Sequence, residues 1–179
     1  TPKALFCHPK DKSGGGKLIV GSLVMNGNNN HLHEALSNSK LYRDYEQAFS
    51  AAAKLPLSLR SVESWQLPHH DRRGENPFCA VMAQTSRACA ACLQVHQKLA
   101  ERARQQPCTL TCAHGLCETA VPVWTGKQLI GFLHTGQVFR KNPTLAQFDQ
   151  AAKQLADWGV KTDKQQLKDA YFNTPVVSP

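Results

Sequence analysis

Cysteine is the residue type in this sequence with the most evident capacity for chemistry. Cys89 and Cys92 form a CxxC pair, Cys79 precedes the pair by ten residues, and Cys112 follows it. Thiols at CxxC spacing chelate a soft metal ion or form a redox disulfide. These four cysteines are therefore candidate ligands of zinc or of an iron–sulfur cluster.

The thiol pattern leaves three interpretations open. Cys112 is followed by His114 and Cys117, which are alternative metal ligands. A zinc ribbon, however, contains two CxxC pairs, and this sequence has one. The pair is also compatible with a redox disulfide, and the cysteines can simply be buried as small hydrophobic residues. Cys7 and Cys108 have no partner at ligand spacing, so we expect no ligand role for them.

Residues for acid–base or nucleophilic catalysis do not form a known motif. The sequence has no Gly-x-Ser-x-Gly elbow, phosphate-binding loop or His-Glu-x-x-His pair. Glu118 is the one carboxylate beside the start of an apolar strand, and isolated histidines such as His96 and His134 are more often structural than ligands. No cysteine is paired with a base at readable spacing. We therefore expect a binding module and not an enzyme.

Composition restricts the class of protein. The chain has 179 residues, of which 41% are hydrophobic and 19% charged, which is typical of one folded domain. The net charge of +8 comes from scattered lysines and arginines, so we interpret it as general surface charge. No secretion signal and no bilayer-spanning apolar run is visible. We expect a cytoplasmic domain with no membrane partner.

The first part of the chain predicts little regular structure. Residues 1–31 contain a Ser-Gly-Gly-Gly tract and an Asn-rich turn, separated by an apolar stretch over 17–25 that is compatible with a short strand. We expect a flexible lead-in over residues 1–31 and a folded domain over residues 32–175.

Helices are predicted where apolar residues recur at helical spacing. The first covers 41–54, with Ser39 as its N-cap, and a second helical stretch covers 77–106. Two more helices are predicted after these, and each begins with a capping-box pattern: Thr144 with Gln147, and Thr162 with Gln165.

Strands are predicted over 57–62, 109–112, 118–124 and 128–135. The last two flank a short Gly126-containing connection and form a β-hairpin. Pairing by hairpin favours an α+β domain with an antiparallel sheet and flanking helices. Such domains commonly hold a ligand between the sheet and a helix.

An ordered set of short motifs extends through most of the chain. The set comprises Asn76-Pro77-Phe78-Cys79, Cys92, Cys112-Ala113-His114-Gly115-Leu116, Ala120-Val121-Pro122-Val123, Ile130-Gly131-Phe132 and Gly136-Gln137-Val138-Phe139. In this order the motifs resemble the PocR ligand-binding sensory domain. The resemblance implies a PAS-like α+β fold and a sensory role, usually in bacterial transcription regulators with an AraC-type DNA-binding domain. It also implies small organic ligands such as diols.

On this resemblance we expect the ligand between the predicted sheet and the helix after Cys79. Glu118 and Gln137 would supply hydrogen bonds, and Trp65, Phe78 and Phe132 would supply apolar walls. No helix-turn-helix pattern follows the last predicted helix. DNA binding would then belong to a separate output domain, and PAS-like sensors often form homodimers. The alternative function is a metal or redox sensor that uses the cysteines.

Overall fold

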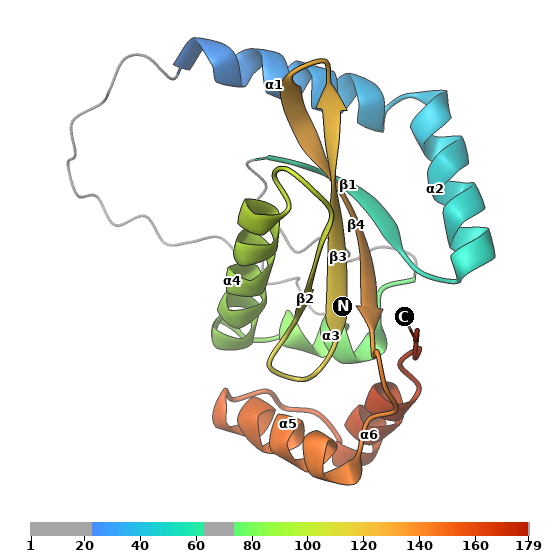
Figure 1. Ribbon diagram of the computed structural model, residues 1–179. Helices are drawn as coiled ribbons and strands as arrows, with labels where there is room; N and C mark the ends of the chain where they lie inside the picture. The colour runs from blue at the N-terminus through green and yellow to red at the C-terminus, as the bar shows by residue number, and fades with distance from the viewer. Residues whose placement is uncertain (1–22, 63–73, 179) are drawn as a thin grey trace, which may run out of the picture.

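The computed structural model describes residues 23–62 and 74–178 (Figure 1). Its elements are α1 (Leu23–Ser37), α2 (Lys40–Ala53), β1 (Leu57–Ser61), α3 (Pro77–Met82), α4 (Ser86–Arg102), β2 (Cys108–Thr111), β3 (Cys117–Thr125), β4 (Gln128–Val138), α5 (Leu145–Asp157) and α6 (Lys164–Phe172). The predicted α+β class, an antiparallel sheet with flanking helices, is confirmed.

The four strands form one antiparallel sheet in the order β1-β4-β3-β2. The predicted hairpin is the β3–β4 pair, in which Thr125 lies opposite Gln128. At the outer edge of the sheet, the Leu59 amide donates a hydrogen bond to the Tyr42 hydroxyl of α2 at 2.7 Å. This bond satisfies one of the backbone donors that an edge strand otherwise leaves open.

Two β-bulges interrupt the pairing of β3 with β4. One lies between Val123 and Trp124, and the other between Cys117 and Glu118. At the second bulge, Cys117 pairs with Val138 while Glu118 pairs with Gly136, so β4 contains one extra residue, Gln137. The φ of Gln137 is +59°, and a Cβ on Gly136 would lie 2.6 Å from the Cys117 carbonyl oxygen. Only glycine fits at this close approach.

Helix α4 covers one face of the sheet (Figure 1). Leu99 of α4 forms a buried hydrophobic cluster with Ala120 of β3 and Phe132 of β4. Helix α1 contacts β4 and β1, and its His33 lies against Gly131. The sheet therefore separates α1 from α4.

The start of the chain differs from the sequence prediction. Helix α1 begins at Leu23, inside the expected lead-in, and covers the Asn-rich stretch that predicts a turn. Its contacts with the sheet override the low helix propensity of asparagine and glycine. Residues 1–22 lie outside the described part, so most of the expected strand over 17–25 does too. The domain boundary at residue 32 stays a prediction.

The capping signals account for most helix boundaries. Ser39 caps α2, and Thr144 forms a complete capping box with Gln147 at α5, as predicted. The stretch over 77–106 is two helices, because Thr85 caps α4 three residues after α3 ends. The expected Thr162 cap is wrong: Asp163 caps α6 by accepting from the Gln166 amide at 2.9 Å.

A second, larger core lies between the C-terminal helices and the end of the sheet (Figure 1). Its centre is Tyr171, whose ring contacts Phe78, Phe139 and Phe148. The Phe139 amide donates to the Pro175 carbonyl, and the Phe139 carbonyl accepts from Val177, each at 2.8 Å. The end of β4 is thereby joined to the C-terminal segment. No described helix has the length and apolar character that crossing a bilayer requires.

Candidate functional site

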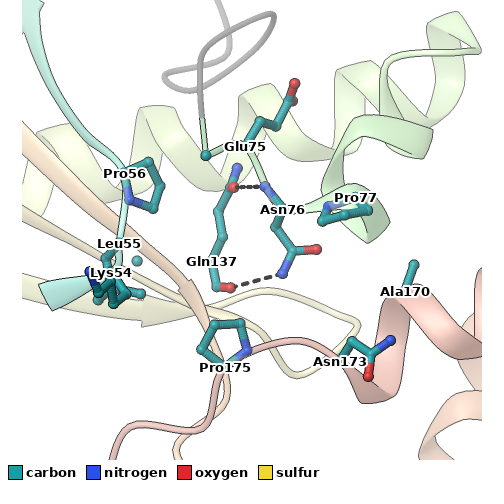
Figure 2. A pocket seen from close by; sticks show the side chains of 12 residues that line it. Lys54, Leu55, Pro56, Glu75, Asn76, Pro77, Gln137, Ala170, Asn173 and Pro175 are labelled. Atoms are coloured by element: carbon teal, nitrogen blue, oxygen red, sulfur yellow. Dashed lines mark hydrogen bonds between the residues drawn. The ribbon is translucent and has the colours of Figure 1, made fainter. Parts of the chain in front are cut away.

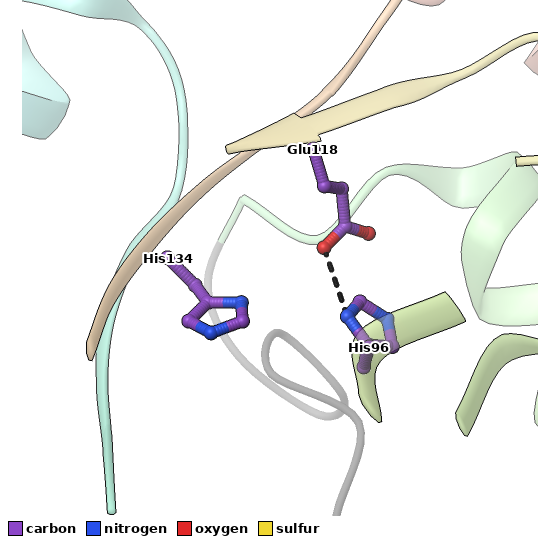
Figure 3. Close-up of side chains that lie close together, drawn as sticks. All are labelled: His96, Glu118 and His134. Carbon is purple, nitrogen blue, oxygen red and sulfur yellow. Dashed lines mark ion pairs between the residues drawn. The ribbon is translucent and has the colours of Figure 1, made fainter. Parts of the chain in front are cut away.

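Three chemically capable side chains converge under α4. His96 comes from α4, Glu118 from β3 and His134 from β4 (Figure 3). One ligand atom of each lies within 4.8 Å of the others, and His96 Nδ1 is 3.2 Å from Glu118 Oε2. Within residues 23–62 and 74–178, this is the one set of three or more His, Cys, Asp or Glu side chains that meets this distance.

Strand register and helix packing explain the convergence. Ala120 lies opposite His134, and Glu118 lies two residues further along β3, so the Glu118 and His134 side chains share a face. That face carries Ala120, which packs against Leu99 of α4. His96 lies one helical turn before Leu99 and therefore faces the same side of the helix.

The polar atoms of this site are buried and poorly satisfied. His134 is 3% exposed, and its Nδ1 has no hydrogen-bond partner among the described residues. The Glu118 side chain is 13% exposed, and its Oε2, although near His96, accepts no well-aligned hydrogen bond from the described chain. Ser58, opposite His134 on β1, is fully buried, and its hydroxyl likewise lacks a described partner.

Burial sets the protonation states. It raises the pKa of Glu118 to about 8, because the carboxylate loses hydration without gaining a compensating charge. Burial, and secondarily the charge of Arg60, lowers the pKa of His134 to about 4. In the metal-free protein at neutral pH, Glu118 is mostly the neutral acid and His134 the neutral imidazole. The site then offers both donors and acceptors but no net charge from these two groups.

The walls beside the polar groups are apolar. The Phe132 ring meets the His134 ring edge-on, with 6.2 Å between centroids, and Phe132 is 1% exposed. Leu99 and Ala120 complete this wall.

The structure brings two of the five predicted ligand-binding residues to this site, Glu118 and Phe132. Phe78 is elsewhere, in the C-terminal core, where its ring contacts Tyr171 with 4.9 Å between centroids. Gln137 is at the second bulge, outside the pairing of the sheet. Trp65 lies outside the described residues.

Gln137 lines a separate hollow of about 200 Å³ near the start of α3 (Figure 2). Its Oε1 accepts a hydrogen bond from the Asn76 amide at 2.8 Å, and its carbonyl accepts from Asn76 Nδ2 at 3.2 Å. Asn76 Nδ2 also donates to Thr174, and its Oδ1 caps α3. The polar atoms that Asn76 presents here are therefore engaged, which makes the hollow a poorer candidate for recognition than the site under α4.

The cysteines gather only in part. Burial raises the pKa of Cys79, and the nearby charges of Glu118, Cys112 and Cys92 raise it further. Burial also raises the pKa of Cys92 to about 12 and the pKa of Cys112 by a smaller amount. These three thiols lie near one another and near Glu118, but they are protonated at neutral pH, whereas the thiolate is the form that reacts or binds metal.

The predicted four-cysteine centre is not assembled by the described residues. No three of the described cysteine sulfurs come within 4.8 Å of one another. Cys89 is buried and is not one of the free thiols, whereas Cys79, Cys92, Cys108, Cys112 and Cys117 are. A thiol centre stays a prediction from the sequence.

The Cys-x-His-Gly-Leu motif has an evident structural role. It forms the turn between β2 and β3, closed by a hydrogen bond from the Cys112 amide to the Leu116 carbonyl at 2.8 Å. Gly115 has a φ of +89°, which favours glycine. The His114 carbonyl accepts from the Tyr171 hydroxyl, also at 2.8 Å, and the His114 ring packs against Phe78. His114 is therefore part of the C-terminal core.

Sequence reasoning missed His96, His134 and Ser58 as site residues. His96 and His134 stand alone in the sequence, and isolated histidines are ordinarily structural. One signal was available: His96 is in phase with Leu99 on a helical stripe, and Glu118 begins an apolar strand. Finding His134 requires the exact strand register, which the sequence does not provide.

A comparison with protein families identifies the chain. The sequence model described as the sensory domain found in PocR matches residues 36–179. The chain therefore belongs to the PocR sensory-domain family, as the motif order indicated. No curated protein and no solved structure matches it significantly.

Proposed function

We propose that this PocR sensory domain binds a small hydroxylated organic molecule in the site between α4 and the sheet. The domain would report its occupancy to a separate DNA-binding domain, as part of a bacterial transcription regulator. Membership of a sensory family supports the role of sensor. The location rests on one observation: polar atoms of Glu118, His134 and Ser58 are buried together without partners in the described chain.

Buried polar atoms without hydrogen-bond partners destabilise the folded state. Each costs about 1–3 kcal/mol when water is removed and no partner replaces it. Folded proteins satisfy the large majority of such groups, so a cluster of exceptions indicates that something else binds there. A molecule with two or more hydroxyl groups supplies donors and acceptors together, and Phe132 can contact its hydrocarbon part.

The test is a thermal-shift screen of diols, sugars and organic acids, run in the presence of a chelator. A ligand that binds only the folded state raises the melting temperature in proportion to the logarithm of its concentration. Ser58→Ala removes one predicted partner with little change of volume and should weaken affinity by about tenfold, as loss of one buried hydrogen bond does.

Asn173→Ala, in the hollow beside Gln137, is the matched control and should leave the affinity unchanged. If no compound in the panel stabilises the protein, either with chelator or after zinc is added back, the proposed function is wrong. If Asn173→Ala abolishes binding while Ser58→Ala does not, the ligand site is the hollow instead.

A further inference from the structure

The histidine–carboxylate cluster has the composition of a metal site. Two imidazoles and one carboxylate, from α4, β3 and β4, bring ligand atoms within 4.8 Å of one another. Zinc and ferrous iron prefer this mixture of nitrogen and oxygen donors, whereas calcium and magnesium prefer oxygen alone. Three protein ligands also leave coordination positions open for a further ligand.

We infer that His96, Glu118 and His134 bind one divalent transition-metal ion of the zinc or ferrous class. The metal ion would lie in the same site, between α4 and the sheet, in which we propose that the organic ligand binds. It rests on that proposal only for the idea that an organic molecule shares the space.

The distances require little rearrangement. Metal–ligand bonds of about 2.0–2.1 Å place neighbouring ligand atoms roughly 3–3.5 Å apart. His96 Nδ1 and Glu118 Oε2 are already 3.2 Å apart, and the two imidazole centroids are separated by 6.1 Å. All three ligand atoms lie within 4.8 Å of one another, so the movement needed to reach metal-ligand spacing is at most about 2 Å.

His134 provides the second, independent observation. It is 3% exposed, its Nδ1 has no hydrogen-bond partner in the described chain, and it faces Glu118 and His96 (Figure 3). A neutral imidazole nitrogen is the form that binds a metal. A metal ion would satisfy this nitrogen and the Glu118 oxygen at once, and binding would release the proton that Glu118 carries.

The ion would also define what binds beside it. Two neutral imidazoles and one carboxylate leave a bound divalent ion with a net charge of +1. The open positions then favour an oxygen donor, such as an alcohol or a carboxylate, over a cationic ligand.

Cobalt(II) titration of the full chain, with any affinity tag removed and thiols reduced, tests the inference. We expect one equivalent to bind with visible d–d bands and without a thiolate-to-cobalt charge-transfer band. Glu118→Gln and His134→Gln should each weaken cobalt affinity by at least about tenfold, since even an outer-shell partner contributes that much. His31→Gln, at an exposed histidine of α1, is the matched control and should not change it.

X-ray absorption on the wild-type protein loaded with zinc provides a readout that needs no variant to fold. Nitrogen and oxygen scatterers at about 2.0–2.1 Å are expected, whereas thiolate ligation would appear at about 2.3 Å. Sulfur in the first shell, cobalt binding that survives both substitutions, or no binding to the folded protein would each overturn the inference.

The two proposals fail separately. If compounds of the organic panel bind in the presence of chelator and cobalt does not bind at all, the metal inference is wrong and the proposed function stands. If cobalt binds as expected and no organic compound binds with or without metal, the proposed function is wrong and the metal site stands.

Discussion

At the scale of single residues, burial in the fold determines the protonation state of the titratable side chains in the site, and their neighbours in the sequence do not. Glu118 and His134 lie 16 positions apart in the sequence, yet their side chains lie on one face of the sheet, on the neighbouring strands β3 and β4. Both are pushed toward their neutral forms by loss of hydration. Glu118 could be predicted from the sequence because it begins an apolar strand, and Phe132 because it belongs to the ordered motif set. The role of His134, in contrast, depends on which residues lie opposite it in the sheet.

His114 gives a prediction that is independent of the site. Burial lowers its pKa below the ordinary value of 6.5, so the folded protein keeps it neutral. Below pH 6.5 the unfolded chain takes up a proton that the folded chain excludes, and stability is lost as pH falls. Urea denaturation at pH 7.5 and 5.5, with chelator, should show a smaller loss for His114→Gln than for the wild type.

His31→Gln, at an exposed histidine of α1, is the matched control and should lose as much stability as the wild type between pH 7.5 and 5.5. An equal acid sensitivity in His114→Gln and wild type would show that His114 does not contribute.

At the scale of elements, the caps and the hairpin could be predicted, but the register could not. Continuing the pairing of Thr125 with Gln128 without interruption would place Ala120 opposite Leu133 and turn His134 to the other face. The bulge between Val123 and Trp124 shifts the pairing by one residue. No turn or glycine signal marks this bulge unambiguously, so the site could not be assembled from the sequence alone.

Asn76 connects α3 with β4 and with the segment after α6, so we expect its substitution to destabilise the fold strongly. Its side chain caps α3 and donates to the Gln137 carbonyl and to Thr174. Asn76→Ala should lower the free energy of unfolding by about 2–3 kcal/mol, because both the cap and buried hydrogen bonds are lost. Chemical denaturation measures this loss.

Asn76→Ser separates the two contributions, since serine keeps a capping oxygen but lacks the Nδ2 donor. It should recover roughly 1 kcal/mol of the loss, the typical value of an N-cap. No difference between the serine and alanine variants would mean that the cross-links to Gln137 and Thr174 account for the whole effect.

At the scale of the whole molecule, the described residues form two hydrophobic clusters that hold different elements together. One joins α4 to the sheet beside the candidate site, and the other joins α3, α5 and α6 to the end of the sheet. Composition indicated a folded domain, the predicted hairpin indicated the α+β class, and the order of motifs indicated the family. The separation into two clusters arises from contacts between distant segments, which periodicity within one segment does not report.

The two clusters can be compared with the same substitution. Leu99 and Leu155 are each 0–1% exposed, one in each cluster. Leu99→Ala and Leu155→Ala should both lower the free energy of unfolding by about 2–5 kcal/mol. Cobalt affinity, measured by titration, should fall for Leu99→Ala because the cavity loosens the position of His96 on the same helix. It should stay at the wild-type value for Leu155→Ala.

An equal fall of cobalt affinity in both variants would contradict this separation. It would mean that the C-terminal cluster also sets the geometry of the site.

Strand β4 has a mechanical consequence beyond its place in the sheet. It carries His134 in the site and leads, through Gly136 and the bulged Gln137, to Phe139, which hydrogen-bonds Pro175 and Val177 on either side. The five steps from His134 to Phe139 include the bulge at Gly136 and Gln137, so they cover less than the roughly 16 Å of a regular strand. A molecule that displaces His134 would therefore also shift the end of β4, which is hydrogen-bonded to the C-terminal segment.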